Sequence, residues 1–206
     1  CAPRLNPHAA PALPCLDEET LERVRITLFD LIATARPLME DLHQFTEGSG
    51  LAIALFDSAA CVLDVLGDRG IIQAAEAVGL RPGVYWSEGH VGTNAFALAL
   101  LERTPAQVVG AEHFIAIYHH WVTTAAPIYG LDGQPLGAIG VMAPAERAQP
   151  DTLGMVMAAA RAIENQLQAA ANLQESHQHL AELQAILEAI DQVVMVLNTR
   201  GEIVRL

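Results

Sequence analysis

A short helix that is apolar on every side, directly preceded by a polar loop, most constrains the fold of this chain. Residues 86–94 read WSEGHVGTN, and residues 95–101 are only Ala, Phe and Leu. A helix without a polar face is buried, so the loop before it points into the interior of a domain. Thr93 or Asn94 can cap this helix, whose first turn offers free N–H groups and a positive dipole end. Such an arrangement is typical of small-molecule pockets.

Two further segments extend this pattern along the chain. Residues 110–114 read GAEHF and residues 121–128 read WVTTAAPI, and an Asp-Gly turn and LGAIGV at 136–141 follow. In this order the motifs resemble the N-terminal GAF sensor domain of sigma-54-dependent regulators of the acetoin- and dihydroxyacetone-catabolism type. The resemblance covers about residues 21–168. It implies a GAF fold and a small acid, diol or ketone as the effector.

The hydrophobic pattern predicts an α+β fold in which helices flank one antiparallel sheet, in agreement with the GAF fold. One hairpin is expected from residues 51–56 and 61–66, and a second from 123–129 and 136–142. The other expected elements are a helix after residue 17 that Pro37 kinks or restarts, helices at 71–78, 94–103 and 112–120, a loop at 80–92, and a strand at 107–109.

The chain is expected to have four parts. These are a disordered or extended, Pro-rich leader at 1–16, a GAF sensor domain at 17–150, a closing and signalling helix at 151–191, and the first strands of a truncated PAS domain at 192–206. The last part predicts a hairpin and resembles the opening of a PAS domain. Since the sequence begins with Cys and stops in a strand-like segment, a fragment of a longer protein is expected.

The second half of the long helix carries a narrow apolar stripe. Its members are Leu173, Leu180, Leu183, Leu187 and Ile190, which past residue 180 alternate in spacings of three and four. This is typical of a coiled-coil seam, so a homodimer through residues 170–191 is predicted. Ser176 interrupts the seam, and an ordinary amphipathic helix is the alternative.

The charge and cysteine content of the chain limit the classes of partner that this region is expected to bind. The formal net charge is −13, and Arg supplies every positive side chain because the chain has no Lys. Nucleic acids and anionic membranes attract clustered positive charge, so neither is an expected partner of this region. Cys1, Cys15 and Cys61 lack metal-ligand spacing and indicate free thiols of a cytoplasmic protein. No apolar run is long enough to span a bilayer.

The candidate ligand-binding side chains lie in the three motif segments. They are Trp86, Glu88, Thr93, Asn94, His113, Trp121 and Thr123. Either tryptophan could be a pocket wall or core packing. Glu88 could be a buried carboxylate that accepts helix N-terminal N–H groups or binds a ligand, and Thr93 and Asn94 are helix caps first.

Metal binding and catalysis are not expected. His90, His113, His119 and His120 do not form a compact ligand set such as HExxH, so we predict no metal and no cofactor. Thr123 and Thr124 stand where the resembling family commonly has Cys and Ser. No GxSxG or phosphate loop is present, and the 80–93 loop has no Cys for methionine sulfoxide reduction, an activity of one enzyme with this fold.

The sequence thus predicts a sensory region that binds a small metabolite and signals through a dimeric helix. The resemblance implies PAS, ATPase and DNA-binding output beyond it. A sensory region of a histidine kinase, a dimerisation module without a ligand, and a redox or metal sensor are the alternatives. An open cavity on which polar side chains converge would favour the sensor, whereas caps that use up Glu88 and His113 would weaken it.

Overall fold

The computed structural model describes residues 5–149, 151–189, 196–197, 200 and 203–205. The chain divides into two compact units, Cys1–Leu167 and Gln168–Leu206. The first unit holds the sheet and the helices around it, and the second holds the remainder of the last long helix and a small hairpin.

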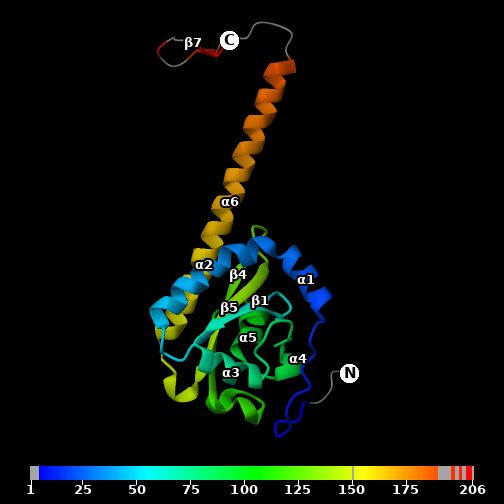
Figure 1. Ribbon diagram of the computed structural model, residues 1–206, viewed down its shortest axis with the longest axis vertical. Coiled ribbons are helices and arrows are strands. Elements are labelled where there is room, and N and C mark those ends of the chain that lie inside the picture. Colours follow the sequence, from blue (N-terminus) through cyan, green and yellow to red (C-terminus); the bar gives the residue numbers. More distant parts are fainter. Residues whose placement is uncertain (1–4, 150, 190–195, 198–199, 201–202, 206) are drawn as a thin grey trace. The chain divides into compact units, whose positions relative to one another are not determined.

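One five-stranded antiparallel sheet organises the first unit, as the sequence predicts (Figure 1). The strand order is β2-β1-β5-β4-β3. The strands are β1 Ala52–Asp57, β2 Val62–Gly67, β3 Ala106–Val109, β4 Trp121–Tyr129 and β5 Pro135–Pro144. Both predicted hairpins are confirmed, because β1 pairs with β2 and β4 pairs with β5.

Alternation along the strands separates two apolar layers. Ala52, Ala54 and Phe56 belong to the layer that contains the buried helix α5 (Ala95–Glu102), whereas Ile53 and Leu55 belong to the opposite layer. Successive side chains of a strand face opposite sides of its sheet, so the two layers cover its two faces. The fold is therefore an α+β sandwich with the sheet in the middle.

The α5 side requires a glycine in the central strand. A Cβ at Gly140 would lie 2.7 Å from the Phe96 ring and 2.6 Å from the Thr124 carbonyl oxygen. Only a residue without a side chain lets the aromatic ring lie this close to the sheet. Asn94 caps α5, and the helix is buried from its first residue, as its lack of a polar face predicts.

Helices α1 (Glu18–Thr27), α2 (Phe29–Thr46) and α6 (Asp151–Ala189) come from the ends of the sequence. Met39 of α2 and Val156 of α6 pack in one core layer against Ile53. Leu28 separates α1 from α2. The sequence predicts a kink or a restart at Pro37, and the structure shows that α2 continues through this residue without a restart. Pro37 lacks one backbone donor, and the packing of α2 on the sheet maintains the helix around it.

Three short helical segments lie between the strands. Helix α3 spans Arg69–Ala77, and the one-turn helix α4, Glu88–Val91, lies within the segment that was expected to be a loop. The predicted helix at 112–120 is wrong, because this region holds two 3-10 turns, η1 (Gly110–Glu112) and η2 (Ala116–Tyr118). His113 is extended between them, with its ring turned inward to the buried Thr123 hydroxyl and the partly buried Gly110 carbonyl. A third 3-10 turn, η3, spans Ala145–Arg147.

Residues 5–16 run along the first unit in an extended path. Cys15 forms an isolated antiparallel bridge with Val84, and the Pro7 carbonyl accepts a hydrogen bond of 2.8 Å from the Ala116 amide. Leu5 and Leu13 pack against the α5-side core. This N-terminal segment therefore packs against the first unit along its described length.

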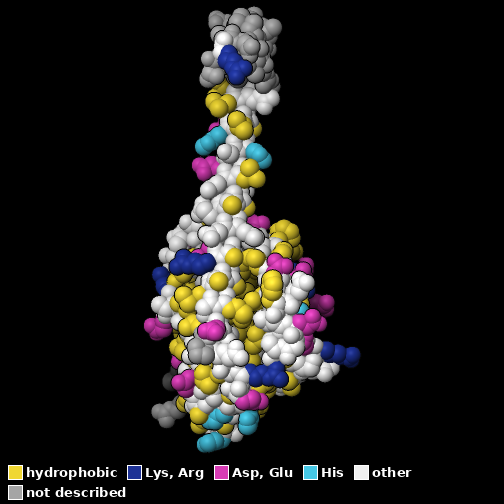
Figure 2. Space-filling model, turned by 90° about the vertical axis from the view of Figure 1, so that its left-hand side faces the viewer, with side chains coloured by type: hydrophobic (Ala, Val, Ile, Leu, Met, Phe, Trp, Pro, Cys, Tyr) yellow, Lys and Arg dark blue, Asp and Glu magenta, His cyan; other side chains and the backbone are white. Residues whose placement is uncertain are grey.

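In the second unit, the part of α6 from Gln168 to Ala189, here called the α6 tail, presents exposed apolar side chains. Leu173, Leu180 and Leu183 are each more than half exposed, as is Ile186, and hydrophobic side chains recur along this tail in Figure 2. The Leu187 side chain and Ile190 lie outside the described residues. Strands β6 (Val196–Leu197) and β7 (Ile203–Arg205) pair antiparallel, and the rest of the predicted hairpin also lies outside them. No helix of the described chain has the length and apolarity to cross a membrane.

Candidate functional site

Three buried polar side chains meet beneath the start of α5. Thr123 projects from β4, Asn94 precedes α5, and His113 lies between η1 and η2. Thr123 Oγ1 accepts a hydrogen bond of 3.0 Å from the Ala95 amide and lies 3.0 Å from His113 Nε2. All three residues are at most 1% exposed. The structure thus brings together predicted site residues from three separate segments.

The tautomer of His113 follows from its partners. Its Nδ1 lies 3.0 Å from the Gly110 carbonyl oxygen, which can only accept, so Nδ1 carries the proton. The neutral Nε2 then accepts from the Thr123 hydroxyl, while the hydroxyl oxygen accepts from Ala95. Burial lowers the pKa of His113, against an opposing effect of the Gly110 hydrogen bond. The imidazole is therefore held neutral as a structural connector.

Asn94 uses its whole amide. Its Oδ1 accepts from the Ala97 amide at 3.0 Å, and its Nδ2 donates to the carbonyl oxygens of Trp86 and Gly92 at 3.0 and 2.8 Å. The oxygen caps α5, and the nitrogen fixes the loop that precedes it. Asn94 is the cap, and Thr93 beside it is only partly buried.

The tryptophans belong to the core. Trp86 is fully buried, its ring packs on Phe96 and Tyr118 with centroids 5.4 and 5.2 Å away, and its Nε1 donates to the Gly79 carbonyl at 3.0 Å. Trp121 is 9% exposed in the same apolar layer. These aromatic rings fill the space between the sheet and the 80–94 loop.

Glu88 lies apart from this cluster. It is exposed in the first turn of α4, so the expectation of a buried carboxylate at the start of α5 is wrong. The reason is that residues 88–91 form their own helical turn, in which the first residue faces solvent. His90, in the same turn, has its Nδ1 2.7 Å from Ser87 Oγ. Among the described residues no group of three His, Cys, Asp or Glu side chains could hold a metal.

The buried polar side chains therefore converge on one another and on backbone groups. Asn94, His113 and Thr123 have the partners that their positions allow, and together they join β4, α5 and the 110–119 segment. Whether the seven predicted residues bind a ligand stays a prediction. The structure assigns five of them to the core and two, Glu88 and Thr93, to its margin.

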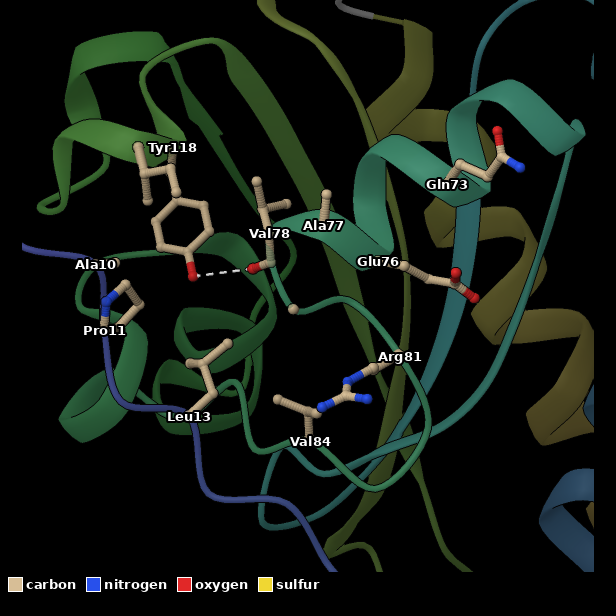
Figure 3. A pocket seen from close by; sticks show the side chains of 12 residues that line it. Ala10, Pro11, Leu13, Gln73, Glu76, Ala77, Val78, Arg81, Val84 and Tyr118 are labelled. Atoms are coloured by element: carbon tan, nitrogen blue, oxygen red, sulfur yellow. Dashed lines mark hydrogen bonds between the residues drawn. The ribbon is translucent and has the colours of Figure 1, made fainter.

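A separate pocket of about 530 Å³ lies at the 79–84 loop (Figure 3). Its walls come from the N-terminal segment, the end of α3, the 79–84 loop and η2. Val84 and Tyr118 are buried at its floor, and the Tyr118 hydroxyl donates to the Val78 carbonyl at 3.2 Å. Gly79, which accepts from Trp86, also lines it. The pocket therefore borders the aromatic core.

Sequence reasoning missed the residues of this pocket. Its charged lining side chains, Glu76 and Arg81, lie outside the conspicuous motifs, and Leu13 belongs to the supposed leader. The only available signal was the apolar Leu13 among prolines. Proline spacing does not show where an extended segment packs, so the pocket depends on tertiary contacts.

Comparison with known proteins identifies a family. Residues 30–167 match the GAF domain. The glycerol metabolism operon regulatory protein of Citrobacter freundii is 29% identical over 95% of this chain and 30% of its own length. The acetoin dehydrogenase operon transcriptional activator AcoR of Bacillus subtilis is 32% identical over 80% of this chain and 27% of its own. The chain thus spans less than a third of these relatives.

A solved structure shares the architecture. The structure of the E. coli DhaR(N)-DhaL complex matches 97% of this chain and 68% of the matched chain, with a TM-score of 0.92 and 25% sequence identity. These similar proteins are regulators of glycerol, dihydroxyacetone and acetoin operons. Their similarity confirms the prediction that this chain is not an enzyme.

Proposed function

The chain belongs to the GAF domain family, and from that premise we propose that it is the N-terminal sensory region of a bacterial transcriptional regulator of a small-metabolite catabolic operon. The similarity to the DhaR sensory region along almost the whole chain carries this proposal. Regulators of glycerol and acetoin operons are similar in sequence to this chain over most of its length, at 29% and 32% identity. The regulated genes are therefore proposed to act on a small polyol, hydroxyketone or related acid.

The proposed signal runs from the GAF domain into the α6 tail. An effector changes an output only when it binds two conformations with different affinity. The first unit, here called the GAF body, ends at Leu167 within α6. One turn earlier, Glu164 Oε1 accepts a hydrogen bond of 3.0 Å from the Tyr129 amide and connects the helix to the sheet. We propose that a homodimer through residues 170–191 transmits the change to a PAS domain, and from there to a sigma-54-activating ATPase and DNA-binding output in the cytoplasm.

The saturated polar cluster suggests how the GAF domain takes part. His113 and Thr123 are hydrogen-bonded to each other, and the Asn94 amide is taken up by backbone groups, so we propose that the three side chains hold the loops in a fixed arrangement around the sensory surface. A small acid, diol or ketone is the proposed effector. In this proposal the cluster positions the loops, and the contacts to the effector come from side chains with unused polar atoms.

A protein partner is a second candidate for the input. The DhaR sensory region of E. coli is named as a complex with DhaL. Because that structure resembles 97% of this chain, we propose that an equivalent surface binds a protein here. A partner protein and a small effector could also act on the same domain.

A chimeric regulator tests the proposal. Residues 1–206 would replace the corresponding part of the Citrobacter regulator, and transcription from a promoter of that regulator would be measured with glycerol, dihydroxyacetone or acetoin. We expect transcription to differ from that of the output domains alone and to depend on one of these compounds or on a co-expressed partner. A folded chimera that behaves like the isolated output domains under every condition would refute the sensory role.

A further inference from the structure

Arg81 lines the 530 Å³ pocket and forms no ion pair or side-chain hydrogen bond with any residue that the structure describes. Within the described part of the GAF body most arginines donate a side-chain hydrogen bond, namely Arg23, Arg25, Arg36, Arg103, Arg147 and Arg161. Arg81 has none among the described residues, although it lines the pocket. A guanidinium is a planar donor that matches a carboxylate, so this side chain is available for an anionic ligand.

The geometry around Arg81 combines that cation with an apolar floor. Figure 3 shows its guanidinium beside Val84, and Leu13 and Tyr118 also line the pocket. Val84 and Tyr118 are each 1% exposed. The Tyr118 hydroxyl donates its hydrogen to the Val78 carbonyl, so in this arrangement it has no hydrogen left to donate to a carboxylate. A ligand that fits has a charged head and an apolar body.

Glu76 restricts the charge of that ligand. It also lines the pocket, and within the described chain it forms no ion pair with Arg81 within 4.0 Å. Figure 3 shows its side chain directed away from Val84. One cation and one anion at the rim favour a ligand with a single negative charge, because a second carboxylate would be repelled by Glu76.

The N-terminal segment forms a strap over this pocket. It is held at one end by the Pro7–Ala116 hydrogen bond, and at the other by a bond of 2.9 Å from the Leu16 amide to the Gly83 carbonyl. Between these points residues 10, 11 and 13 line the pocket. The strap is thus hydrogen-bonded near both ends, where the Pro14 carbonyl also accepts from the Tyr85 amide. Among the described residues, 10–13 form no backbone hydrogen bond, which allows this stretch to adjust around a bound molecule.

We propose that this pocket binds a small amphipathic monocarboxylate, with the carboxylate on Arg81 and the apolar chain against Leu13, Val84 and Tyr118. The inference rests on the proposed sensory function and names the ligand class and its site. A volume of about 530 Å³ is in the range of small-molecule pockets. Binding there is sensed through Gly79, whose carbonyl holds the Trp86 indole of the aromatic core.

Calorimetric titration of the whole 206-residue chain with hexanoate tests the site. Hexanamide replaces the charge by a neutral isostere, and adipate adds a second carboxylate. We expect hexanoate to bind more tightly than either and to change the tryptophan fluorescence of a Trp121→Phe variant, in which Trp86 is the one remaining tryptophan. Arg81→Gln should weaken hexanoate binding about tenfold or more, because a charged hydrogen bond is lost. Arg69→Gln, an exposed arginine of α3 outside the lining, is the matched control.

Three results would overturn the inference: no binding of hexanoate, equal binding of hexanamide, or an Arg81→Gln variant that binds like the wild type. Arg81 is exposed, so a folding defect in this variant is not expected, and its thermal unfolding would be measured alongside. If hexanoate fails to bind while the chimeric regulator still responds, only the pocket inference fails. If hexanoate binds and the chimera is unresponsive, the sensory role fails instead.

Discussion

At the scale of single residues, one hydroxyl joins two parts of the fold. Thr123 Oγ1 serves both the first amide of α5 and the imidazole of His113, and all of these groups are buried. Buried polar groups are expensive to leave unpaired, so one side chain controls the satisfaction of two others. The family resemblance implies Cys at this position, and a hydroxyl suits these two hydrogen bonds better than a weakly donating thiol does.

Replacing Thr123 by Val should destabilise the fold by about 2–3 kcal/mol, since the Ala95 amide and His113 Nε2 each lose a partner. Urea unfolding measures this difference. Thr123→Ser keeps the hydroxyl and removes one methyl group, and its loss should stay within about 1 kcal/mol. Equal stability of the Val and Ser variants would show that the hydroxyl is not the connector described here.

His113 should also make stability depend on pH. Its folded pKa is lowered by burial, so near pH 6.5 the unfolded chain binds the proton more readily than the folded chain. The contribution of His113 to the free energy of unfolding is therefore fully present above about pH 6.5. It falls as the pH drops toward the folded pKa, by at most about 1.4 kcal/mol per pH unit. Urea midpoints of wild type and His113→Gln between about pH 7.5 and about pH 5.5 should diverge less as the pH falls. A constant difference would contradict this origin.

At the scale of elements, helix α6 has two different halves. As far as Leu167 it packs on the sheet through Val156, Ala160 and Ile163, and beyond that residue its described leucines are exposed. A helix with an exposed apolar stripe is marginal in water unless a partner covers the stripe. The heptad spacing of Leu173 and Leu180 fits a second copy of the same helix.

Leu180→Asp should shift the chain from dimer to monomer, because a carboxylate would have to be buried in the seam. Light scattering across a concentration series measures the change. Gln178→Asp, two residues away and off the stripe, should leave the dimer intact. Ser176→Leu fills the gap in the seam and should tighten the dimer by about tenfold, given the energy of burying a leucine. A monomeric wild-type chain would contradict the dimer.

At the scale of the whole GAF body, the N-terminal segment and the motif loops form one packed region. Pro14 accepts from the Tyr85 amide at 3.2 Å, directly next to Trp86, and Pro7 accepts from the Ala116 amide in the segment that contains His113. The strap thus contacts both loops that hold the polar cluster. A change at the N-terminus is therefore expected to reach the aromatic core.

Removing residues 1–16 should expose the amides of Tyr85 and Ala116, which lose their carbonyl partners. Hydrogen exchange at these two amides should accelerate about tenfold or more, since local opening then no longer requires breaking the bonds to the strap. The Ala97 amide, held by Asn94 within buried α5, is the internal control and should keep its protection. Unchanged exchange at all three amides would show that the strap does not hold the loops.

Local pattern alone determined the main elements of this protein. The apolar run at 95–101 predicted a buried helix, and the apolar runs on either side of residues 57–60 and of the Asp-Gly turn predicted both hairpins, because apolar runs and turn residues are local properties. The ordered motifs also identified the family. Only the tertiary structure placed Glu88 in solvent, made His113 extended, and laid Leu13 over Gly79. Those outcomes depend on contacts between segments far apart in the chain, and no local period encodes which polar groups become each other's partners.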